Sequence, residues 1–459
     1  MPGEKQRAIF GGSFNPPANH HLEIARELAK HFDELIVVPC GPRPDKPGTD
    51  DIPSVYRAAM VDMAFRDVPK VIVDLFDLES EEFTRTEDLD RRYSKDGVPW
   101  HVVGADLVAG GANGTSQIQQ SWRNGRNLWN QAHFAVFTRP SYHLDPSDLP
   151  PNHRLFELQE VGSSAEIRDK LFRMQPVKDL LPEQVAQYIQ RHNLYRGIKL
   201  AAKVTTRFPK PNVELIVDER NPEALKLAKY FPKRSSENPD LFVVIGGDGM
   251  MLRSIRQFWR KRIPFYGINA GHTGFLLNQP RNTATSLGER DLVLHHLPLL
   301  WVETETVDGE IHTGLAFNDA WVERATGQSA WISVSVNGKL RIDRLISDGV
   351  LVATASGSAA YARAMGGAPI PFNTPVLLLV GSNVFRPDWK FSVLPIDSTV
   401  EFVSLDPKKR PLSGFLDGES LGEVKSMRIR LSRSAGVELA FDPEFDPAEK
   451  LAHLQFPQI

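Results

Sequence analysis

Two glycine-rich turns, each directly after a short apolar run, are the segments of this sequence best suited to bind phosphate. The first is Gly11-Gly12-Ser13-Phe14 and the second is Gly246-Gly247-Asp248-Gly249. Adjacent glycines let backbone N–H groups approach a phosphate, and a following helix adds the positive end of its dipole. A carboxylate in such a turn, as at Asp248, can also act as a base toward an attacking hydroxyl. Each turn alone is also compatible with a plain structural turn, so its surroundings must decide.

The first turn lies in a region of alternating strand and helix patterns. Apolar runs predict strands at residues 8–10, 35–39, 71–74, 101–103 and 134–138. Between them, apolar residues recur at helical spacing over 22–29 and 58–64, and a last helix is expected at 182–192. The proline-rich stretch 139–154 predicts a surface loop. This pattern is typical of βαβ units on a parallel sheet, and Arg196-Gly197 is the expected boundary.

The second turn lies in a second region of the same kind, followed by a different one. Strands are expected at 199–204, 214–217, 241–245 and 264–268, with helices at 222–230 and 250–260. From about residue 292 onward, alternating strands and tight turns predict a β-rich part, with a hairpin at Asn337-Gly338.

Length and composition agree with several soluble domains that bind small molecules. The chain has 459 residues, a prior of about three domains. Its net charge of −3 excludes a bulk positive field for nucleic acid or an anionic membrane. The single cysteine, Cys40, excludes an intrachain disulfide, and the adjacent pairs His20-His21 and His295-His296 lack metal-ligand spacing, so no metal site is expected. No signal peptide or membrane span is apparent, so we expect a cytoplasmic protein.

The first region resembles the nicotinate or nicotinamide mononucleotide adenylyltransferases of the HxGH nucleotidyltransferase superfamily. The resemblance spans residues 8–195 and rests on GGSFNPP, PRPDK, YRAAM, FTRTEDL, GAD, the Trp122-Arg123 pair and SSAEIR, in that order. It implies an in-line attack of a mononucleotide 5′-phosphate on the α-phosphate of ATP, with release of pyrophosphate. The implied ATP and phosphate residues are Gly11, Gly12, Ser13, Phe14, Ser163, Ser164 and Arg168. The implied mononucleotide residues are Lys46, Thr84, Thr86, Asp106 and Trp122. For Arg168 a solvated helix charge is the alternative.

The HxGH segment itself departs from the family pattern, because it is Ala18-Asn19-His20-His21 here. The second histidine is kept as His21, the implied catalytic residue, whereas the first is Ala18. On a helix, residue 20 points about 200° away from residue 18, so His20 is not a simple substitute unless the helix starts late. Losing one preorganised donor to the transition state can cost roughly 10²- to 10³-fold in rate.

The second and third regions resemble the ATP-dependent NAD kinases over about residues 198–430. Besides the Asp248 turn, the resemblance rests on GINAGHTGFL, Asn318-Asp319, TASGSAAY and FLDGES. It implies transfer of the ATP γ-phosphoryl group to the 2′-hydroxyl of NAD, with Mg²⁺ as cofactor and Asp248 as the catalytic carboxylate. Gly246, Gly247 and Gly249 would contact phosphate. The implied NAD residues are Phe275, Asn318, Asp319, Asp348, Ser356, Ala360 and Tyr361. For Tyr361, packing in the core is the alternative.

This region also departs from its family pattern, because Met250, Ala355 and Ala359 replace residues that are hydroxyl residues or proline in the family. The central carboxylate is intact. Diacylglycerol and sphingosine kinases share a similar glycine turn, but Asn318-Asp319 and TASGSAAY favour an NAD kinase.

Together these patterns predict an α/β protein with a Rossmann-like nucleotidyltransferase domain at 1–196, a kinase α/β domain at 197–290 and a β-rich domain at 291–459. We expect a bifunctional enzyme that makes a dinucleotide from ATP and nicotinamide or nicotinate mononucleotide and phosphorylates NAD with ATP. It is also expected to form a homo-oligomer. The alternative is an NAD kinase whose N-terminal domain binds a nucleotide without turnover and regulates or scaffolds the kinase. A remoter alternative is a lipid kinase.

Overall fold

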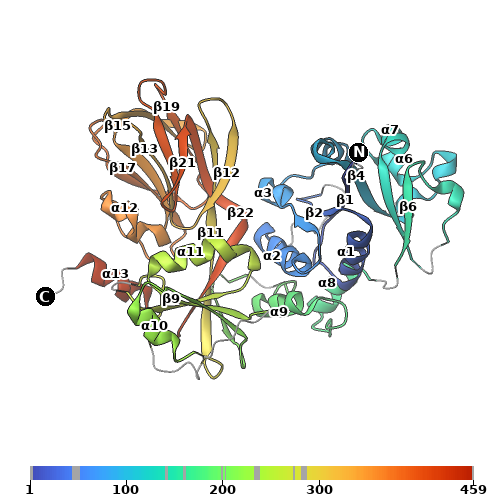
Figure 1. The fold of residues 1–459 in the computed structure, drawn as a ribbon, viewed down its shortest axis with the longest axis horizontal. Coiled ribbons are helices and arrows are strands. Elements are labelled where there is room, and N and C mark those ends of the chain that lie inside the picture. The colour runs from blue at the N-terminus through green and yellow to red at the C-terminus, as the bar shows by residue number, and fades with distance from the viewer. Residues whose placement is uncertain are drawn as a thin grey trace. The chain divides into compact units, whose positions relative to one another are not determined.

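The computed structural model describes residues 4–43, 52–139, 143–158, 162–197, 200–201, 203–231, 238–271, 274–280 and 287–456. The chain forms two compact units, which are Met1–Ala201 and Ala202–Ile459. We call them the N-terminal and the C-terminal unit. Figure 1 shows their elements, and each unit is described by itself.

The N-terminal unit is built on a six-stranded, fully parallel sheet with the order β3-β2-β1-β4-β5-β6. The strands are β1 (Gln6–Gly12), β2 (Glu34–Pro39), β3 (Val71–Val73), β4 (Val98–Gly104), β5 (His133–Thr138) and β6 (His153–Glu157). This confirms the expected α/β class and the first five strands. The sixth strand was not predicted, because its first residues lie at the end of the proline-rich stretch.

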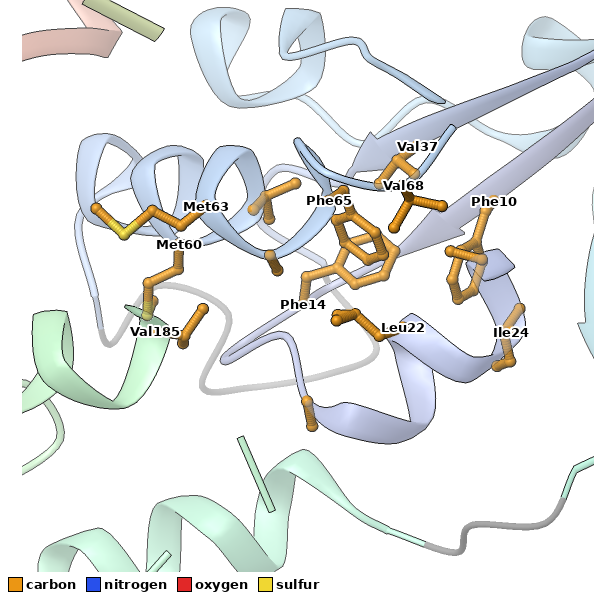
Figure 2. Packing of buried hydrophobic residues seen from close by; sticks show 14 of the residues in the cluster. Phe10, Phe14, Leu22, Ile24, Val37, Met60, Met63, Phe65, Val68 and Val185 are labelled. Carbon is orange, nitrogen blue, oxygen red and sulfur yellow. The ribbon is translucent and has the colours of Figure 1, made fainter. Parts of the chain in front are cut away.

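Nine α-helices are described in the N-terminal unit. They are α1 (Asn19–His31), α2 (Ser54–Phe65), α3 (Phe76–Ser80), α4 (Thr86–Tyr93), α5 (Ala105–Val108), α6 (Gln117–Ser121), α7 (Gly125–Gln131), α8 (Ser164–Phe172) and α9 (Glu183–His192). The largest core cluster joins α1, α2 and α9 to the sheet. Figure 2 shows Phe14 and Phe65 at its centre, between Leu22 of α1 and Val68, so the glycine turn is anchored in this core.

The C-terminal unit contains a ten-stranded and a six-stranded sheet. In its α/β part the strands β8, β9 and β10 are parallel, and the turn Gly246-Gly247 joins β9 to a helix. The strands here are β7 (Lys203–Arg207), β8 (Val213–Val217), β9 (Leu241–Gly246) and β10 (Phe265–Asn269), and the helices are α10 (Pro222–Ala228) and α11 (Asp248–Phe258).

The expected β-rich part follows, and its strands enter both sheets. They are β11 (Asp291–Glu305), β12 (Ile311–Ala316), β13 (Asp319–Arg324), β14 (Ala330–Val336), β15 (Lys339–Ser347), β16 (Gly349–Thr354), β17 (Val376–Ser382), β18 (Phe391–Pro395), β19 (Val400–Ser404), β20 (Leu412–Leu416), β21 (Glu419–Val424) and β22 (Ser426–Phe441). The helices are α12 (Tyr361–Ala364) and α13 (Pro447–Gln455). The predicted hairpin is present, because β14 pairs with β15 across Asn337 and Gly338, both at positive φ.

Two strands connect the two parts of the C-terminal unit, because β11 pairs with β7 of the α/β part and β22 pairs with β10. The long strand β22 pairs with β11 and β19 and then, at Leu439 and Ala440, in parallel with β10 of the α/β part. The α/β part and the β-rich part of this unit therefore share a sheet. The domain limits at residues 196 and 290 stay predictions. Among the described residues, no helix is long and apolar enough to cross a membrane.

Candidate functional sites

The first glycine turn lies where the strand order of the N-terminal sheet reverses. β1 and β4 are neighbours, but the chain continues outward from β1 through β2 and from β4 through β5. In parallel α/β sheets, ligands bind at the carboxyl ends of the strands at this switch point. Gly11 and Gly12 end β1, and Gly104 ends β4 just before Asp106. The sheet therefore brings the predicted phosphate turn and Asp106 to the same edge.

Side chains of α2 and α8 hold the segment after this turn in place. The Nη2 atom of Arg57, a residue that is 1% exposed, donates to the carbonyl oxygens of Ser13 at 2.9 Å and Cys40 at 2.5 Å. Arg168 Nη1 donates to Asn15 O at 2.6 Å, and Ser164 Oγ donates to Pro16 O at 2.9 Å. The N-terminal end of α8 is thus bound to the glycine segment, which brings three predicted phosphate residues, Ser163, Ser164 and Arg168, beside it.

Phe14 contributes to this turn through its backbone. Its side chain is 1% exposed and packs edge-on against Phe65, with ring centroids 5.4 Å apart. A Cβ atom at Gly12 would lie 3.1 Å from the Phe14 ring, so a larger residue would push against this anchor. At Gly11 an added Cβ would meet no described atom within 4 Å, so its backbone faces open space.

The residues of the altered HxGH segment lie at the start of α1. Ala18 is the N-cap residue, and its N–H donates to His21 Nδ1 at 3.0 Å. Because Nδ1 accepts this bond, the ring proton of neutral His21 is on Nε2. Burial, and then the neighbouring His20, hold the pKa of His21 well below its usual value, so the ring is neutral at pH 7.

His20, which the helical spacing disfavours as a substitute for residue 18, lies next to the predicted phosphate residues. A Cβ atom built on Gly162, which precedes Ser163, would be 2.7 Å from His20 Nδ1. The helix starts only at Asn19, so position 18 is not yet helical and the helical spacing does not apply to it. Burial, and then the positive charge of Arg139, lower the pKa of His20 to about 4. Sequence reasoning missed Arg139, because it begins a proline-rich segment without periodicity.

The other residues predicted to bind the mononucleotide come from separate segments of the N-terminal unit. Thr84 donates its hydroxyl to Asp77 Oδ1 at 2.6 Å, and its backbone N–H bonds Oδ2 of the same carboxylate. Thr86 begins α4, and Trp122 is partly buried against a separate cluster that includes Ile118. Lys46 lies outside the described residues.

In the C-terminal unit, Asp248 is the first residue of α11, directly after β9 and Gly247. Its carboxylate accepts the backbone N–H groups of Phe275 at 2.9 Å and Leu276 at 2.8 Å. Gly274 has a φ of +58°, and a Cβ there would be 2.3 Å from Asn269, so the turn needs glycine. Phe275 is buried, so it contributes to this site through its N–H group. A Cβ at Gly247 would meet no described atom within 4 Å, which leaves room for a ligand at the turn.

The predicted NAD pair, Asn318-Asp319, is held by a second, partly buried carboxylate. Asp417 accepts the N–H groups of Phe317 and Asn318, each at 2.7 Å, and of Asp319 at 3.1 Å. From the other side, Thr354 donates its hydroxyl to Phe317 O at 2.9 Å. The segment 317–319 is therefore fixed through both its donors and its acceptors.

The TASGSAAY segment packs directly on this pair. A Cβ atom at Gly357 would lie 2.2 Å from the carbonyl oxygen of Asn318, so only glycine fits there. The structure thus brings Ser356 and its neighbours to Asn318. The side-chain Oδ1 of Asn318 is buried and has no hydrogen-bond partner in the described part of the chain. A buried acceptor without a partner is costly, so a ligand that donates a hydrogen bond would be favoured here.

Asp319 lies beside Asp417, and the neighbouring carboxylate affects the pKa of Asp319. Burial, and then the charge of Asp417, raise the pKa of Asp319 to about 8. Arg256 of α11 donates to the backbone oxygen of Asp417 at 3.1 Å and also bonds Glu419. Since Asp248 begins the same helix, Arg256 links the element that carries the glycine turn to the support of the Asn318-Asp319 pair.

Tyr361 and Asp348 occupy the surface beyond this pair. Tyr361 is 39% exposed and its ring lies 4.9 Å from that of Trp321, so it is not a core residue. Ala360 beside it is exposed as well. Asp348 bonds Arg324 and Asn383 near the opposite end of the β13–β16 pair from Asp319. Burial, followed by Glu323, Asp319 and Asp348, raises the pKa of Tyr361, which places this tyrosine within electrostatic range of both aspartates.

Comparison with known proteins agrees with both halves of this description. The family model described as cytidylyltransferase-like matches residues 9–170, and the model of the ATP-NAD kinase N-terminal domain matches residues 170–290. The NAD kinase of Rickettsia bellii is 33% identical over 234 residues, which cover 50% of this chain and 91% of that protein. The NAD kinase of Xylella fastidiosa is 36% identical over 223 residues, or 48% of this chain and 86% of the relative.

The chain therefore belongs to the NAD kinase family, and it carries a nucleotidyltransferase-like domain at its N-terminal end. It is similar to the solved structure of yeast NADH kinase complexed with NADH, with a TM-score of 0.43 and 16% identity over 72% of this chain and 80% of that one. An NAD kinase from Archaeoglobus fulgidus in complex with ATP gives a TM-score of 0.40 and 22% identity over 53% of this chain and 95% of that one.

Proposed function

We propose that this NAD kinase is bifunctional, with adenylyl transfer from ATP to nicotinamide or nicotinate mononucleotide in the N-terminal unit and phosphorylation of NAD by ATP in the C-terminal unit. The support is that each unit keeps a glycine turn at the carboxyl end of a parallel strand. The two implied reactions are also consecutive, because the product of the first is the substrate class of the second. A homo-oligomer and a cytoplasmic location remain predictions.

For the kinase reaction, the observation that carries the proposal is the buried, unpartnered Oδ1 of Asn318. An adenine amino group is a hydrogen-bond donor, as this acceptor needs. Asp319 would bind the adjoining ribose, and Asp248 would orient the 2′-hydroxyl or accept its proton. The backbone around Gly246 and Gly247 would bind ATP phosphates. Catalysis of this kind is mainly positioning and charge stabilisation.

Mg²⁺ fits this site as an ion that binds together with the phosphates of ATP. Among the described residues, no three His, Cys, Asp or Glu side chains are grouped to hold a metal ion. Mg²⁺ commonly binds through one or two carboxylates together with substrate phosphates and water, and Asp248 is a carboxylate at the glycine turn. When bound, it would neutralise charge on the transferred phosphoryl group.

For adenylyl transfer, the N-terminal unit would act by orientation without a covalent intermediate. The backbone of Gly11 and Gly12 would contact ATP, and Arg168 with Ser163 and Ser164 would bind the leaving pyrophosphate. The Nε2–H group of His21 is a neutral donor. His20 and Arg139 would supply the contacts that the family obtains from its first histidine, because His20 lies against Gly162.

Ala18 supports the alternative, in which the N-terminal unit binds a nucleotide without turnover. Its methyl group is fully buried and cannot donate a hydrogen bond to a phosphate. Under this alternative the unit would regulate or scaffold the kinase.

Pyrophosphate release separates the two proposals. The purified chain is mixed with ATP, Mg²⁺ and either mononucleotide, and the rate is compared with those of His20→Ala, His21→Ala and a matched control, His31→Gln, at the other end of α1. We expect both alanine variants to lose about 10²-fold or more, as for a lost transition-state donor, and the control to match the parent. No release above the His21→Ala background would contradict adenylyl transfer and leave the alternative.

A further inference from the structure

The turn Gly274–Leu277 beside Asp248 is held from two sides. On one side, the Asp248 carboxylate accepts the N–H groups of Phe275 and Leu276. On the other side, the ammonium group of Lys450 donates to the carbonyl oxygens of Gly274 and Leu277. An anion and a cation therefore bind the donors and the acceptors of the same four residues.

Lys450 comes from α13, close to the end of the chain. The helix is capped by Asp446, whose side chain accepts the N–H of Ala448, and Leu451 is buried in the core shared with β9, β10 and α11. The Lys450 ammonium also lies 4.9 Å from the centre of the Phe445 ring. Lys450 thus links α13 to the turn after β10, two elements far apart in the sequence.

The charges around Lys450 are few. Asp248 on α11 is the one charged group that acts on its pKa among the described residues. The turn offers the ammonium group carbonyl oxygens, and the Phe445 ring lies just before α13. Burial lowers the pKa of Lys450 to about 8, and Asp248 opposes this by raising it. The ammonium form prevails at neutral pH and is lost as the pH rises through about 8.

We propose that Lys450 is a positioning residue for phosphoryl transfer, which holds the Gly274–Leu277 turn so that its N–H groups fix the orientation of the Asp248 carboxylate. This rests on the proposed role of Asp248. In the absence of the ammonium group, both carbonyl oxygens lose the lysine donor, and Gly274 O keeps its bond from the Leu277 N–H at 3.2 Å, so the turn is held less firmly beside α11. The carboxylate would then lose its fixed direction toward the 2′-hydroxyl. The kinase site is complete only when α13 is docked.

Such a role predicts an effect on kcat rather than on NAD binding. The Asn318-Asp319 pair is held separately by Asp417 and Thr354. A misplacement of about 1 Å at a reacting group can cost roughly 10²-fold in rate. We therefore expect Lys450→Met to lower kcat for NADP formation by about 10- to 100-fold, with the KM for NAD within about threefold of the parent.

The test uses the full chain and four proteins: the parent, Lys450→Met, Lys450→Arg and the control Glu449→Gln on the same helix. We expect Lys450→Arg to recover most of kcat, because its guanidinium can donate to both carbonyls. The kcat of the parent should fall as the pH rises above about 8, whereas that of Lys450→Arg should not, since arginine stays charged. Thermal unfolding of each protein shows whether α13 still docks.

Three outcomes would overturn the proposal. One is a kcat of Lys450→Met within twofold of the parent. Another is equal loss in Lys450→Met and Lys450→Arg with equally lowered melting temperatures, which would make the lysine merely structural. The third is a kcat of Lys450→Arg that falls above about pH 8 in the same way as the kcat of the parent. Failure of the kinase assignment would be seen separately, because Asp248→Asn would then retain NADP formation.

Discussion

Replacement of Asp417 by asparagine tests how the C-terminal unit holds its NAD-binding pair. The carboxylate accepts three backbone N–H groups, two on Oδ1 and one on Oδ2. Asparagine keeps the shape but has only one acceptor oxygen, so at least one buried N–H would face an amide donor. Side chains elsewhere in the site are unchanged.

The size of the effect follows from these bonds. A buried donor left without its acceptor costs about 1–3 kcal/mol, which corresponds to roughly 5- to 150-fold in an equilibrium constant. Since the three N–H groups belong to the segment that carries Asn318 and Asp319, we expect this cost in NAD binding. The KM for NAD should rise by about tenfold or more.

The assay couples NADP formation to an NADP-specific dehydrogenase, and calorimetric titration with NAD measures binding directly. Glu423→Gln is the matched control, because Glu423 is exposed on the strand that follows the same turn. The reasoning would be refuted if Asp417→Asn bound NAD within twofold of the parent while retaining its melting temperature.

Two further predictions concern the same pair. The folded-state pKa of Asp319, about 8, lies above its unfolded value of about 4. The contribution of this difference to the free energy of unfolding is fully present below about pH 4 and is lost as the pH rises toward 8. Denaturant titrations should therefore show the unfolding free energy of the parent falling relative to Asp319→Asn across this range, by on the order of a few kcal/mol, and a constant difference would contradict the burial argument. Gly357→Ala should raise the KM for NAD more than the control Gly338→Ala does. A Cβ at Gly357 would lie 2.2 Å from Asn318 O, whereas a Cβ at Gly338 would meet no described atom within 4 Å. Steady-state kinetics of the two variants measure the difference, and equal KM values for NAD would contradict the prediction.

The sequence predicts those strands and turns that short runs of neighbouring residues determine. Five strands of the first sheet, the strand before Gly246 and the hairpin at Asn337-Gly338 all follow from short apolar runs and turn residues. The sixth strand was missed, because a proline-rich segment leads into it and its burial alternates only weakly.

Contacts between distant segments could not be predicted in this way. β22 returns to pair with β10, and Asp417 bonds the segment 317–319 about a hundred residues earlier. No periodicity in the sequence encodes either pairing. Arg57 is another example, because a charged residue on a helix usually predicts an exposed surface, whereas this one is buried beneath the glycine turn.

The measurement that tests the central claim most directly is the fate of a mononucleotide given excess ATP and Mg²⁺. Nicotinamide mononucleotide and, separately, its nicotinate analogue are incubated with the full chain and with Asp248→Asn, and the products are identified by mass spectrometry. We predict that both proteins make a dinucleotide from at least one mononucleotide, and that only the parent converts the nicotinamide product, or added NAD, into NADP. No dinucleotide from either mononucleotide, or NADP formed equally by Asp248→Asn, would contradict the account.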